Sequence, residues 1–344
     1  MRAMVLQAPS PVEKAPLSLR EVELPEPGRG EIRIRVRTCG VCRTDLHIVE
    51  GELPPQKQSV IPGHQIVGTV ESLGRDAGRW PLGKRVGAAW LRHTCGHCRW
   101  CRRGEENLCE TARFTGYHSD GGYAEYAVVD ENFVYAIPEA LTDVEAPPLL
   151  CAGIIGLRAL KRAGIRRGGR LGLYGFGASA HIAIQIARHL DCSVYVLTRE
   201  ERHRHLAKQL GARWVGDARE SPPERLDSAV LFAPAGELVP VALQALDRGG
   251  TLALAGIHLS EIPPLDYEKH LFYERNLRSV TANTRADGEE LLRLAGEIPI
   301  HAHTVPFALE QANTALTQLK HDGFEGAAVL ACQTNPSSSE RPGR

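Results

Sequence analysis

The sequence predicts an α/β protein in which an irregular, β-rich region precedes a doubly wound parallel sheet. Residues 1–150 are rich in Gly and Pro and contain short β-like runs, whereas from about residue 152 apolar strands alternate with helical patterns. Such alternation is typical of a parallel sheet covered by helices. The chain has 344 residues, more than one hydrophobic core usually organises, so we expect two domains.

Local patterns justify the elements in order. In the first region, residues 31–38 (EIRIRVRT) alternate apolar and polar side chains, and residues 65–74 (QIVGTVESLG) form another strand-like run. The second region alternates strands and amphipathic helices at 169–177, 178–190, 193–198, 200–212, 228–233 and 250–256. Gly211 is the expected C-cap of the helix at 200–212.

The C-terminal part returns to a different pattern. Helices are predicted at 287–298 and 309–320, and a strand at 326–331. Residues 333–344, QTNPSSSERPGR, are polar and contain Pro, which predicts a disordered tail.

Composition and charge exclude several classes of protein. Hydrophobic residues make up 43% and charged residues 24%, as in ordinary soluble proteins. Lys+Arg and Asp+Glu both total 41, so no overall field favours nucleic acid or an anionic membrane. The first residues lack the apolar core of a signal peptide, and no window approaches the roughly 20 apolar residues of a membrane span. We therefore expect a cytoplasmic protein without nucleic-acid or membrane partners.

Four of the nine cysteines predict a structural metal site. Cys95, Cys98, Cys101 and Cys109 have the spacing C-x2-C-x2-C-x7-C, which suits tetrahedral Zn²⁺ with no open position. An iron–sulfur cluster is a weaker alternative. Such a zinc loop also occurs in nucleic-acid-binding modules, and the nearby arginines and Trp100 suit that reading, but the balanced net charge speaks against it.

A glycine-rich turn predicts a dinucleotide site. Residues 175–180 read G-x-G-x-x-A between a predicted strand and a predicted helix. Gly175 permits the tight turn, and Gly177 and Ala178 let the backbone approach a pyrophosphate. Ala180 keeps the helix close to the strand, and the helix N-terminus offers free N–H groups to the phosphates.

The end of the next strand predicts a preference for NADP, with NAD possible. An NAD enzyme usually has an acidic residue there to bind the ribose 2′-hydroxyl. This chain has Thr198 and Arg199, and acidic residues follow one or two positions later. Because a guanidinium pairs bidentately with phosphate, this pair suits a 2′-phosphate.

Together the motifs resemble one family. CGVCRTDLH (39–47), GHQIVG (63–68), the four-cysteine segment, DGGYAEYAVV (120–129), LLCAGIIGLRAL (149–160) and the G-x-G-x-x-A turn occur in that order. This order resembles the zinc-dependent alcohol dehydrogenases of the medium-chain dehydrogenase/reductase family, most closely the bacterial members with catalytic and structural zinc. The resemblance extends from Met1 to about Leu330.

The resemblance implies a second zinc site and a set of roles. Two zinc ions per chain are implied, the catalytic one held by Cys42, His64 and Cys151. Thr44 would contact the substrate oxygen, His47 would relay its proton, and Asp45 would support His64. Arg43 would contact the pyrophosphate. The residues matched to the pocket lining are Trp90, Tyr117 and Ile155. Three protein ligands would leave one position open for substrate. Simpler interpretations are a redox pair for Cys39 and Cys42, a surface position for His47, and core packing for Cys151, Trp90 and Tyr117.

Several positions depart from the family pattern. Gln65 stands where a glutamate usually follows the ligand histidine, so we expect a more electrophilic zinc than in a Gln65→Glu variant. Ile155 and Gly156 replace threonines, which removes an expected nicotinamide contact, and Ala327 replaces a basic residue, for which Arg285 could compensate.

The resemblance also implies the architecture and the reaction. A GroES-like catalytic domain would comprise 1–149 and 287–344, interrupted by a Rossmann domain at 150–286, with the active site in the cleft between them. The implied reaction is reversible oxidation of an alcohol by NAD(P), with apolar primary alcohols or aldehydes preferred. Alternatives are a polyol or secondary-alcohol dehydrogenase of the same family, or a non-catalytic zinc protein that binds a cofactor or nucleic acid. The family implies a homodimer or homotetramer.

Overall fold

Strand β3 (Glu31–Val41) is the centre of the larger β-structure in the computed structural model, which describes residues 1–333. Its sheet has the order β16-β17-β3-β4-β5-β9, with β8 also paired to β3. The other strands are β4 (Gln65–Leu73), β5 (Arg85–Ala88), β8 (Tyr126–Asp130), β9 (Val134–Ala136), β16 (Thr304–Ala308) and β17 (Ala327–Ala331). Strands β16 and β17 pair in parallel, and β17 pairs with β3 in antiparallel orientation. The C-terminal strand therefore joins the sheet of the N-terminal region.

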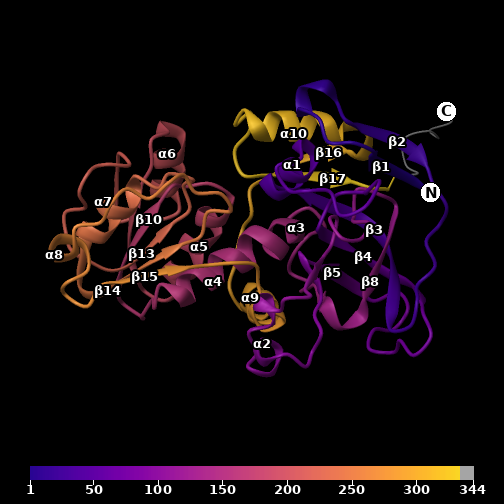
Figure 1. Ribbon diagram of the computed structural model, residues 1–344, viewed down its shortest axis with the longest axis horizontal. Coiled ribbons are helices and arrows are strands. Elements are labelled where there is room, and N and C mark those ends of the chain that lie inside the picture. Colours follow the sequence, from indigo (N-terminus) through magenta and orange to yellow (C-terminus); the bar gives the residue numbers. More distant parts are fainter. Residues whose placement is uncertain (334–344) are drawn as a thin grey trace, which may run out of the picture. The chain divides into compact units, whose positions relative to one another are not determined.

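Shorter elements complete this first unit (Figure 1). Two small ribbons are formed by β1 (Arg2–Leu6) with β2 (Leu17–Glu21) and by β6 (Leu91–His93) with β7 (Arg113–Phe114). The helical elements are η1 (Val12–Lys14), α1 (Arg43–Glu50), η3 (Glu131–Phe133), α3 (Ala146–Pro148), η5 (Leu309–Gln311) and α10 (Ala312–Lys320). Alternate residues of β3, such as Ile32, Ile34 and Val36, are fully buried in its core.

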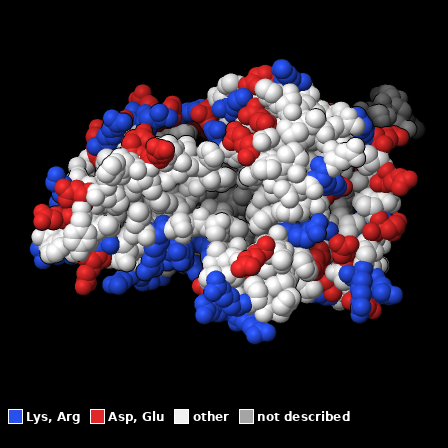
Figure 2. Space-filling view, in the orientation of Figure 1, with Lys and Arg blue, Asp and Glu red and all other residues white. Residues whose placement is uncertain are grey.

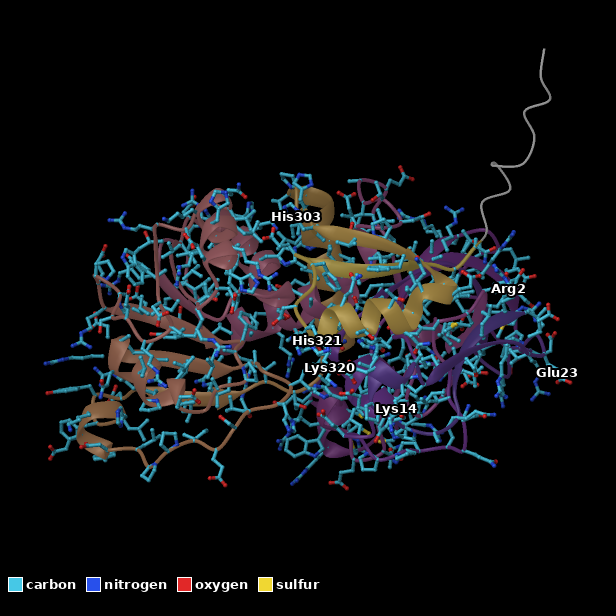
Figure 3. All side chains as sticks on the ribbon, turned by 90° about the horizontal axis from the view of Figure 1, so that it is seen from above. Arg2, Lys14, Glu23, His303, Lys320 and His321 are labelled. Atoms are coloured by element: carbon cyan, nitrogen blue, oxygen red, sulfur yellow. The ribbon has the colours of Figure 1, made fainter. Side chains whose placement is uncertain are left out.

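Ion pairs attach α10 to the beginning of the chain. Lys320 and His321, at the end of the helix, lie 2.9 and 3.1 Å from the Glu13 carboxylate, and Lys320 also pairs with Glu50 at 2.8 Å (Figure 3). The hydrogen bond from Lys320 lowers the pKa of Glu13 to about 2. The C-terminal segment therefore belongs to the first unit by both strand pairing and charge pairing.

The second unit contains a six-stranded, all-parallel sheet in the order β12-β11-β10-β13-β14-β15. Its strands are β10 (Arg170–Tyr174), β11 (Ser193–Leu197), β12 (Trp214–Gly216), β13 (Leu226–Leu231), β14 (Leu246–Leu254) and β15 (Asn276–Ser279). In chain order the pattern is 3-2-1-4-5-6, the doubly wound topology of dinucleotide-binding domains.

Helices precede, connect and follow these strands. They are α4 (Ile154–Arg162), α5 (Ala178–His189), α6 (Glu201–Gln209), α7 (Leu238–Ala245), α8 (Tyr267–His270) and α9 (Arg285–Glu297). The central strands carry buried apolar residues: Leu171, Val194 and Leu231 are all fully buried, as expected for strands covered on both faces. The edge strand β15 is mostly exposed. Within residues 1–333, no helix has both the length and the apolar character needed to cross a bilayer.

The α/β class and the strand–helix alternation predicted from sequence are confirmed. Gly211 was expected to be the C-cap of α6, but the C-cap is Leu210. Gly211 follows it and has φ +89°. The elements β12, α7, α8 and β15 were not identified from sequence, because they are short or lack a clear period.

The contact-based units differ from the boundaries expected from sequence. The second unit comprises Cys95–Glu110 and Cys151–Ala302, so both the four-cysteine segment and α9 pack within it. Residues 95–110, and those from 287 onward, were expected in the other domain. The predicted disordered tail, apart from Gln333, lies outside the described residues.

Gly63 combines a left-handed backbone with closely packed surroundings. Its φ is +98°, and a Cβ atom would lie 2.8 Å from Tyr123 Cε1 and 2.9 Å from Cys39 Sγ. We expect Gly63→Ala to lower the free energy of unfolding by about 1–2 kcal/mol through backbone strain and about 1–3 kcal/mol more through overpacking. Urea unfolding measures the change.

Gly83→Ala is the matched control. Gly83 has φ +78°, but a Cβ atom there would meet nothing within 4 Å. Only the backbone contribution should remain. Equal losses of stability in the two variants would contradict a packing role for Gly63.

Candidate active site

The first turn of α1 positions two of the site residues. Cys42 is the N-cap of this helix, and its Sγ accepts a hydrogen bond from the Thr44 N–H at 3.3 Å. Asp45 completes a capping box, because its Oδ2 accepts from the Cys42 N–H at 2.9 Å. The sequence C-R-T-D thus begins the helix and orients a thiol and a carboxylate together.

His64 is held from one side by Asp45. The other carboxylate oxygen, Oδ1, accepts hydrogen bonds from the Gly63 N–H at 3.2 Å and from His64 Nδ1 at 3.1 Å. Both Asp45 and His64 are completely buried. His64 Nε2 is also buried, and among residues 1–333 it has no hydrogen-bond partner. The ring therefore presents one free nitrogen, the arrangement typical of a metal-ligating histidine with a carboxylate behind it.

Cys151 supplies the third donor. It lies in a π-helical turn (Leu149–Gly153) that leads directly into α4. π-Helical turns are rare and occur frequently at functional sites. One ligand atom each from Cys42, His64 and Cys151 lies within 4.8 Å of the others. Two thiolates and an imidazole at this spacing fit a zinc ion and would leave a fourth position for another ligand.

The electrostatics of His64 reflect this donor set. Burial opposes a charged imidazole, but the negative charges of Asp45 and Cys42 outweigh it and raise the pKa of His64 to about 10. A neutral imidazole is required for metal binding, so a cation bound here would have to displace a proton at neutral pH.

The four predicted zinc cysteines also lie together. The sulfur atoms of Cys95, Cys98, Cys101 and Cys109 are all within 4.8 Å of one another. The Cys98 backbone N–H donates a hydrogen bond to Cys95 Sγ at 3.3 Å, and the Cys95 backbone N–H donates one to Cys109 Sγ at 3.4 Å. Hydrogen bonds from the backbone N–H groups of His97 and Cys98 lower the pKa of the Cys95 thiol. Four sulfur donors and no fifth group fit a closed, structural zinc site.

The residues predicted for proton transfer lie on α1. Thr44 is 8% exposed, and His47 lies in the last turn of the helix. His47 Nδ1 lies 2.6 Å from Glu52 Oε2. Arg43, predicted to contact a pyrophosphate, is half-exposed and pairs with Asp322 at 3.0 Å.

An aromatic stack extends from His64. Trp90 lies edge-on to the His64 ring at 5.1 Å, and stacks with Phe114 at 4.8 Å and with Tyr117 at 6.0 Å between ring centroids. Tyr117 donates a hydrogen bond from its hydroxyl to the Pro54 carbonyl at 2.8 Å. Both predicted aromatic residues therefore belong to the surroundings of His64.

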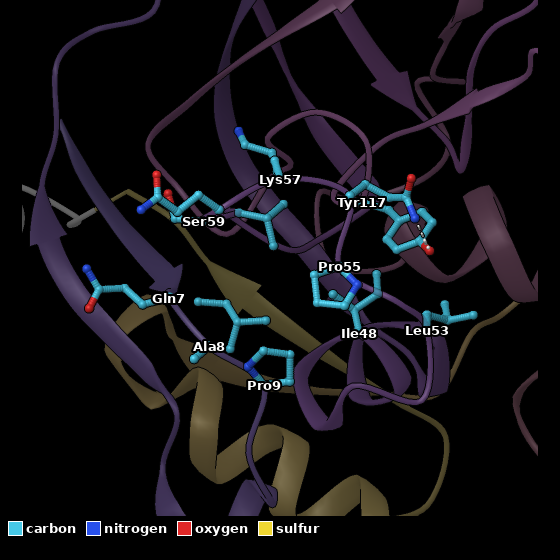
Figure 4. Close-up of a pocket in the computed structure, with 13 residues that line it drawn as sticks. Gln7, Ala8, Pro9, Ile48, Leu53, Pro55, Lys57, Ser59 and Tyr117 are labelled. Carbon is cyan, nitrogen blue, oxygen red and sulfur yellow. Dashed lines mark hydrogen bonds between the residues drawn. The ribbon is translucent and has the colours of Figure 1, made fainter.

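Tyr117 also lines a cavity of about 210 Å³ (Figure 4). The cavity lies beside α1, where Ile48 directly follows His47, and its wall includes Leu53, Pro55 and Gln56. Gln56 Nε2 donates to the Tyr117 hydroxyl at 3.0 Å. The wall is mostly apolar, so it suits an apolar ligand better than a strongly polar one.

The glycine-rich turn has the predicted strand–turn–helix context. Gly175 follows β10 with φ +87°, where a Cβ atom would lie 2.8 Å from the Ala233 backbone nitrogen. Gly177 is the N-cap of α5, Ala178 begins that helix, and Ala180 is fully buried. A Cβ atom on Gly177 would meet nothing within 4 Å, so the backbone there is open to an approaching ligand.

The residues that depart from the family pattern lie in buried or half-buried positions. Gly156 brings α4 close to α5, since a Cβ atom there would lie 3.1 Å from the Ser179 carbonyl oxygen. Gln65 is 2% exposed and packs against Gly40. A Cβ atom on Gly40 would lie only 2.8 Å from Gln65 Cδ. Ile155 is half-buried in α4, and Ala327 is buried in β17.

Thr198 and Arg199, on which the NADP prediction rests, directly follow β11. Thr198 is 5% exposed and Arg199 is exposed. The Thr198 carbonyl accepts from Arg204 Nη1 at 3.0 Å, which adds a second guanidinium to this corner.

Sequence reasoning missed three residues. Glu52 contacts His47 just after the helix ends at Gly51, a short-range signal that could have been found. Tyr123 is completely buried; burial is the main cause that raises the pKa of its hydroxyl, and the nearby Asp45 carboxylate adds to it. Glu106 is buried beside the four-cysteine cluster and contacts Arg285, a pairing that spans 179 positions and has no local signal.

Family models match both parts of the chain. Residues 28–139 match the alcohol dehydrogenase GroES-like domain, and residues 178–297 match the zinc-binding dehydrogenase domain. The chain is 50% identical to the probable alcohol dehydrogenase AdhA of Mycobacterium tuberculosis, over 96% of this chain and 97% of that protein. It is 35% identical to an alcohol dehydrogenase of Geobacillus stearothermophilus, over 92% and 96% of the two chains.

Solved structures agree. A cobalt- and zinc-bound thermostable alcohol dehydrogenase from Pyrobaculum aerophilum superimposes with a TM-score of 0.87 at 29% identity, covering 96% of this chain and 99% of the other. AibC superimposes with a TM-score of 0.88 at 26% identity, covering 96% and 95%. The sequence relatives, both domain matches and the fold lead to one conclusion: the chain belongs to the zinc-dependent alcohol dehydrogenases of the medium-chain dehydrogenase/reductase family.

Proposed function

We propose that this alcohol dehydrogenase holds two zinc ions and interconverts apolar primary alcohols and aldehydes, with NADP as the preferred hydride carrier. The observation that carries the proposal is the donor set of Cys42, His64 and Cys151, in which a buried imidazole nitrogen has no hydrogen-bond partner among residues 1–333. Zinc bound there would act as a Lewis acid toward a substrate oxygen.

The chain's own residues would handle the proton that the alcohol loses. The Thr44 hydroxyl, next to Cys42 in the first turn of α1, would accept it from the substrate hydroxyl. His47, one turn further along the same helix, would pass it to solvent, since its side chain is 15% exposed. Glu52 would orient the imidazole through the 2.6 Å contact with Nδ1.

The cofactor would lie at the glycine-rich turn of the second unit. The first turn of α5 offers backbone N–H groups to the pyrophosphate, and the open space at Gly177 lets it approach. The exposed Arg199 at the end of β11 would bind a 2′-phosphate.

The substrate preference follows from the apolar surroundings. The cavity beside Tyr117 would receive the apolar part of the substrate, and Trp90 would add an apolar surface beside His64. A polyol or secondary-alcohol dehydrogenase is the second candidate. A polyol would need several polar partners, and the exposed surface of the cavity wall is more apolar than polar, although Gln, Lys and Ser side chains also line it.

We further propose a cytoplasmic homo-oligomer. None of the nine cysteines, which all lie within residues 1–333, forms a disulfide, as expected in a reducing compartment. On the face shown in Figure 2, both basic and acidic side chains occur on each unit. The exposed Tyr267, Phe272 and Tyr273 near the edge strand β15 suit contact with a second copy, and light scattering would give the mass in solution.

Metal counting joined to a substrate panel tests the function. We expect two zinc ions per chain, and one in the Cys42→Ser and His64→Ala variants. NADPH consumption with apolar aldehydes should exceed that with ketones or sugars, and should fall by at least about 10³-fold in either variant. One zinc in the unsubstituted protein would instead support a non-catalytic binder, and a preference for polyols would favour the second candidate.

Arg199→Ala tests the cofactor preference. Loss of a charged phosphate contact should weaken NADPH binding by about tenfold or more, with little change for NADH. Fluorescence titration measures both Kd values, and Arg213→Ala, which removes an exposed arginine paired with Glu224, is the control. Tighter binding of NADH than of NADPH by the unsubstituted protein would reject the assignment.

Gln65→Glu tests the role of the neutral amide beside His64. A carboxylate there would add negative charge near the donor set and make loss of the substrate proton harder. We expect the alkaline rise of the alcohol-oxidation rate to move to higher pH by about one unit. Gln209→Glu adds the same charge at an exposed position and should leave the profile unchanged. Superimposable profiles for Gln65→Glu and the original protein would show that this charge is idle.

A further inference from the structure

Two buried carboxylates, Glu106 and Asp287, lie outside the site already described. Glu106 is 6% exposed and Asp287 is 2% exposed. Both belong to the second unit, the first within the four-cysteine segment and the second in the first turn of α9. Because buried carboxylates are stable only when paired and hydrogen-bonded, their partners indicate which parts of the fold they join.

Glu106 joins the four-cysteine segment to the start of α9. It lies in η2 (Glu106–Leu108), immediately before Cys109. Its Oε1 accepts hydrogen bonds from the Arg285 backbone N–H at 3.0 Å and from Arg285 Nε at 3.3 Å. The neighbouring Asn107 donates from Nδ2 to the Thr281 carbonyl at 2.9 Å. The metal-binding loop is therefore fastened at two points to the segment that begins α9.

Asp287 joins the same helix end to α4. With Thr284 it forms a capping box: Thr284 Oγ1 accepts from the Asp287 N–H, and Asp287 Oδ2 accepts from the Thr284 N–H at 3.0 Å. The same carboxylate pairs with Arg158 at 2.6 Å and with Lys161 at 3.2 Å. Arg158 and Lys161 are one turn apart on α4. Both oxygens of Asp287 thus fix α4 against the N-terminus of α9.

Helix α4 in turn carries Cys151. The helix begins at Ile154 and continues the π-helical turn in which Cys151 lies. A displacement of α4 along its axis would move the Cys151 sulfur by a comparable amount, because no flexible loop separates them. Charged, buried contacts therefore connect the four-cysteine cluster to one of the three donors of the other cluster, through the beginning of α9.

We propose that Glu106 is a positioning residue for Cys151. Through Glu106, the closed four-cysteine site sets the position of the Cys151 sulfur, which is the third donor of the open site. The inference rests on the proposed function, since it takes Cys151 as a ligand of the catalytic metal. It assigns the four-cysteine site a role in metal retention at the other site, in addition to stapling its own loop.

Glu106→Ala tests the proposal, with Glu105→Ala as the matched control. Glu105 is exposed and adjacent in sequence, so its loss removes a charge without touching α9. The zinc-loaded variants are compared for metal content and for the rate at which a chelator removes the metal of the open site. We expect Glu106→Ala to keep its four-cysteine metal and to lose the other roughly three- to thirtyfold faster than Glu105→Ala.

A spectroscopic readout separates positioning from general loss of stability. With Co²⁺ in place of the zinc, the sulfur-to-metal absorption bands that disappear in Cys151→Ser report on this sulfur. These bands should shift in Glu106→Ala and stay unchanged in Glu105→Ala. If Glu106→Ala fails to fold, Glu106→Gln decides, because it keeps an acceptor for the Arg285 N–H and removes the charge; it should show a smaller shift in the same direction.

The pathway through α9 has its own test. If Glu106 and Asp287 act through the same helix end, Glu106→Ala combined with Asp287→Asn should accelerate metal loss by less than the product of the single effects. A full product, or equal rates and spectra for Glu106→Ala and Glu105→Ala, would overturn the proposal and leave the proposed function intact. Failure of the unsubstituted protein to bind metal at Cys42, His64 and Cys151 would overturn the proposed function instead.

Discussion

The buried carboxylate of Asp45 is the interaction on which the candidate site depends. One oxygen holds the backbone of Cys42 at the start of α1, and the other holds the Gly63 N–H and His64 Nδ1. Strand pairing cannot align these groups, because they lie in a helix cap and in a turn. An unpaired carboxylate at this depth would be strongly unfavourable, so Asp45 keeps its three partners together.

The two cysteine clusters differ in the number of donors that they offer to a metal ion. Four thiols within one short loop would close a tetrahedron around zinc, and the loop is joined to the start of α9 by Glu106. Two thiols and one imidazole leave a position open, and Trp90 and Tyr117 form an apolar environment near it. In the family to which the chain belongs, an open position is where a substrate oxygen can be activated.

Sequence reasoning identified the site residues well where the signal is local. The four-cysteine spacing, the glycine-rich turn and the C-R-T-D cap each lie within about fifteen positions, so their geometry follows from short turns and helix caps. It was less informative about the domain boundaries. Residues 95–110 are bracketed by the first unit in the chain, yet they pack with the second, because Glu106 and Asn107 find their partners at 281–285.

The sequence by itself determined the α/β class and the family, and the spacing of the four cysteines predicted the closed donor set, because periodicity and short motifs record local geometry. The set of Cys42, His64 and Cys151 was predicted from the family resemblance. Only the tertiary structure decided which nitrogen of His64 stays free, that Glu52 supports His47, and that Glu106 and Asp287 connect the four-cysteine loop to the helix carrying Cys151. These pairings depend on burial and charge between segments far apart in the chain. Such contacts form only when the packed core brings their partners together, so no pattern along the sequence records them.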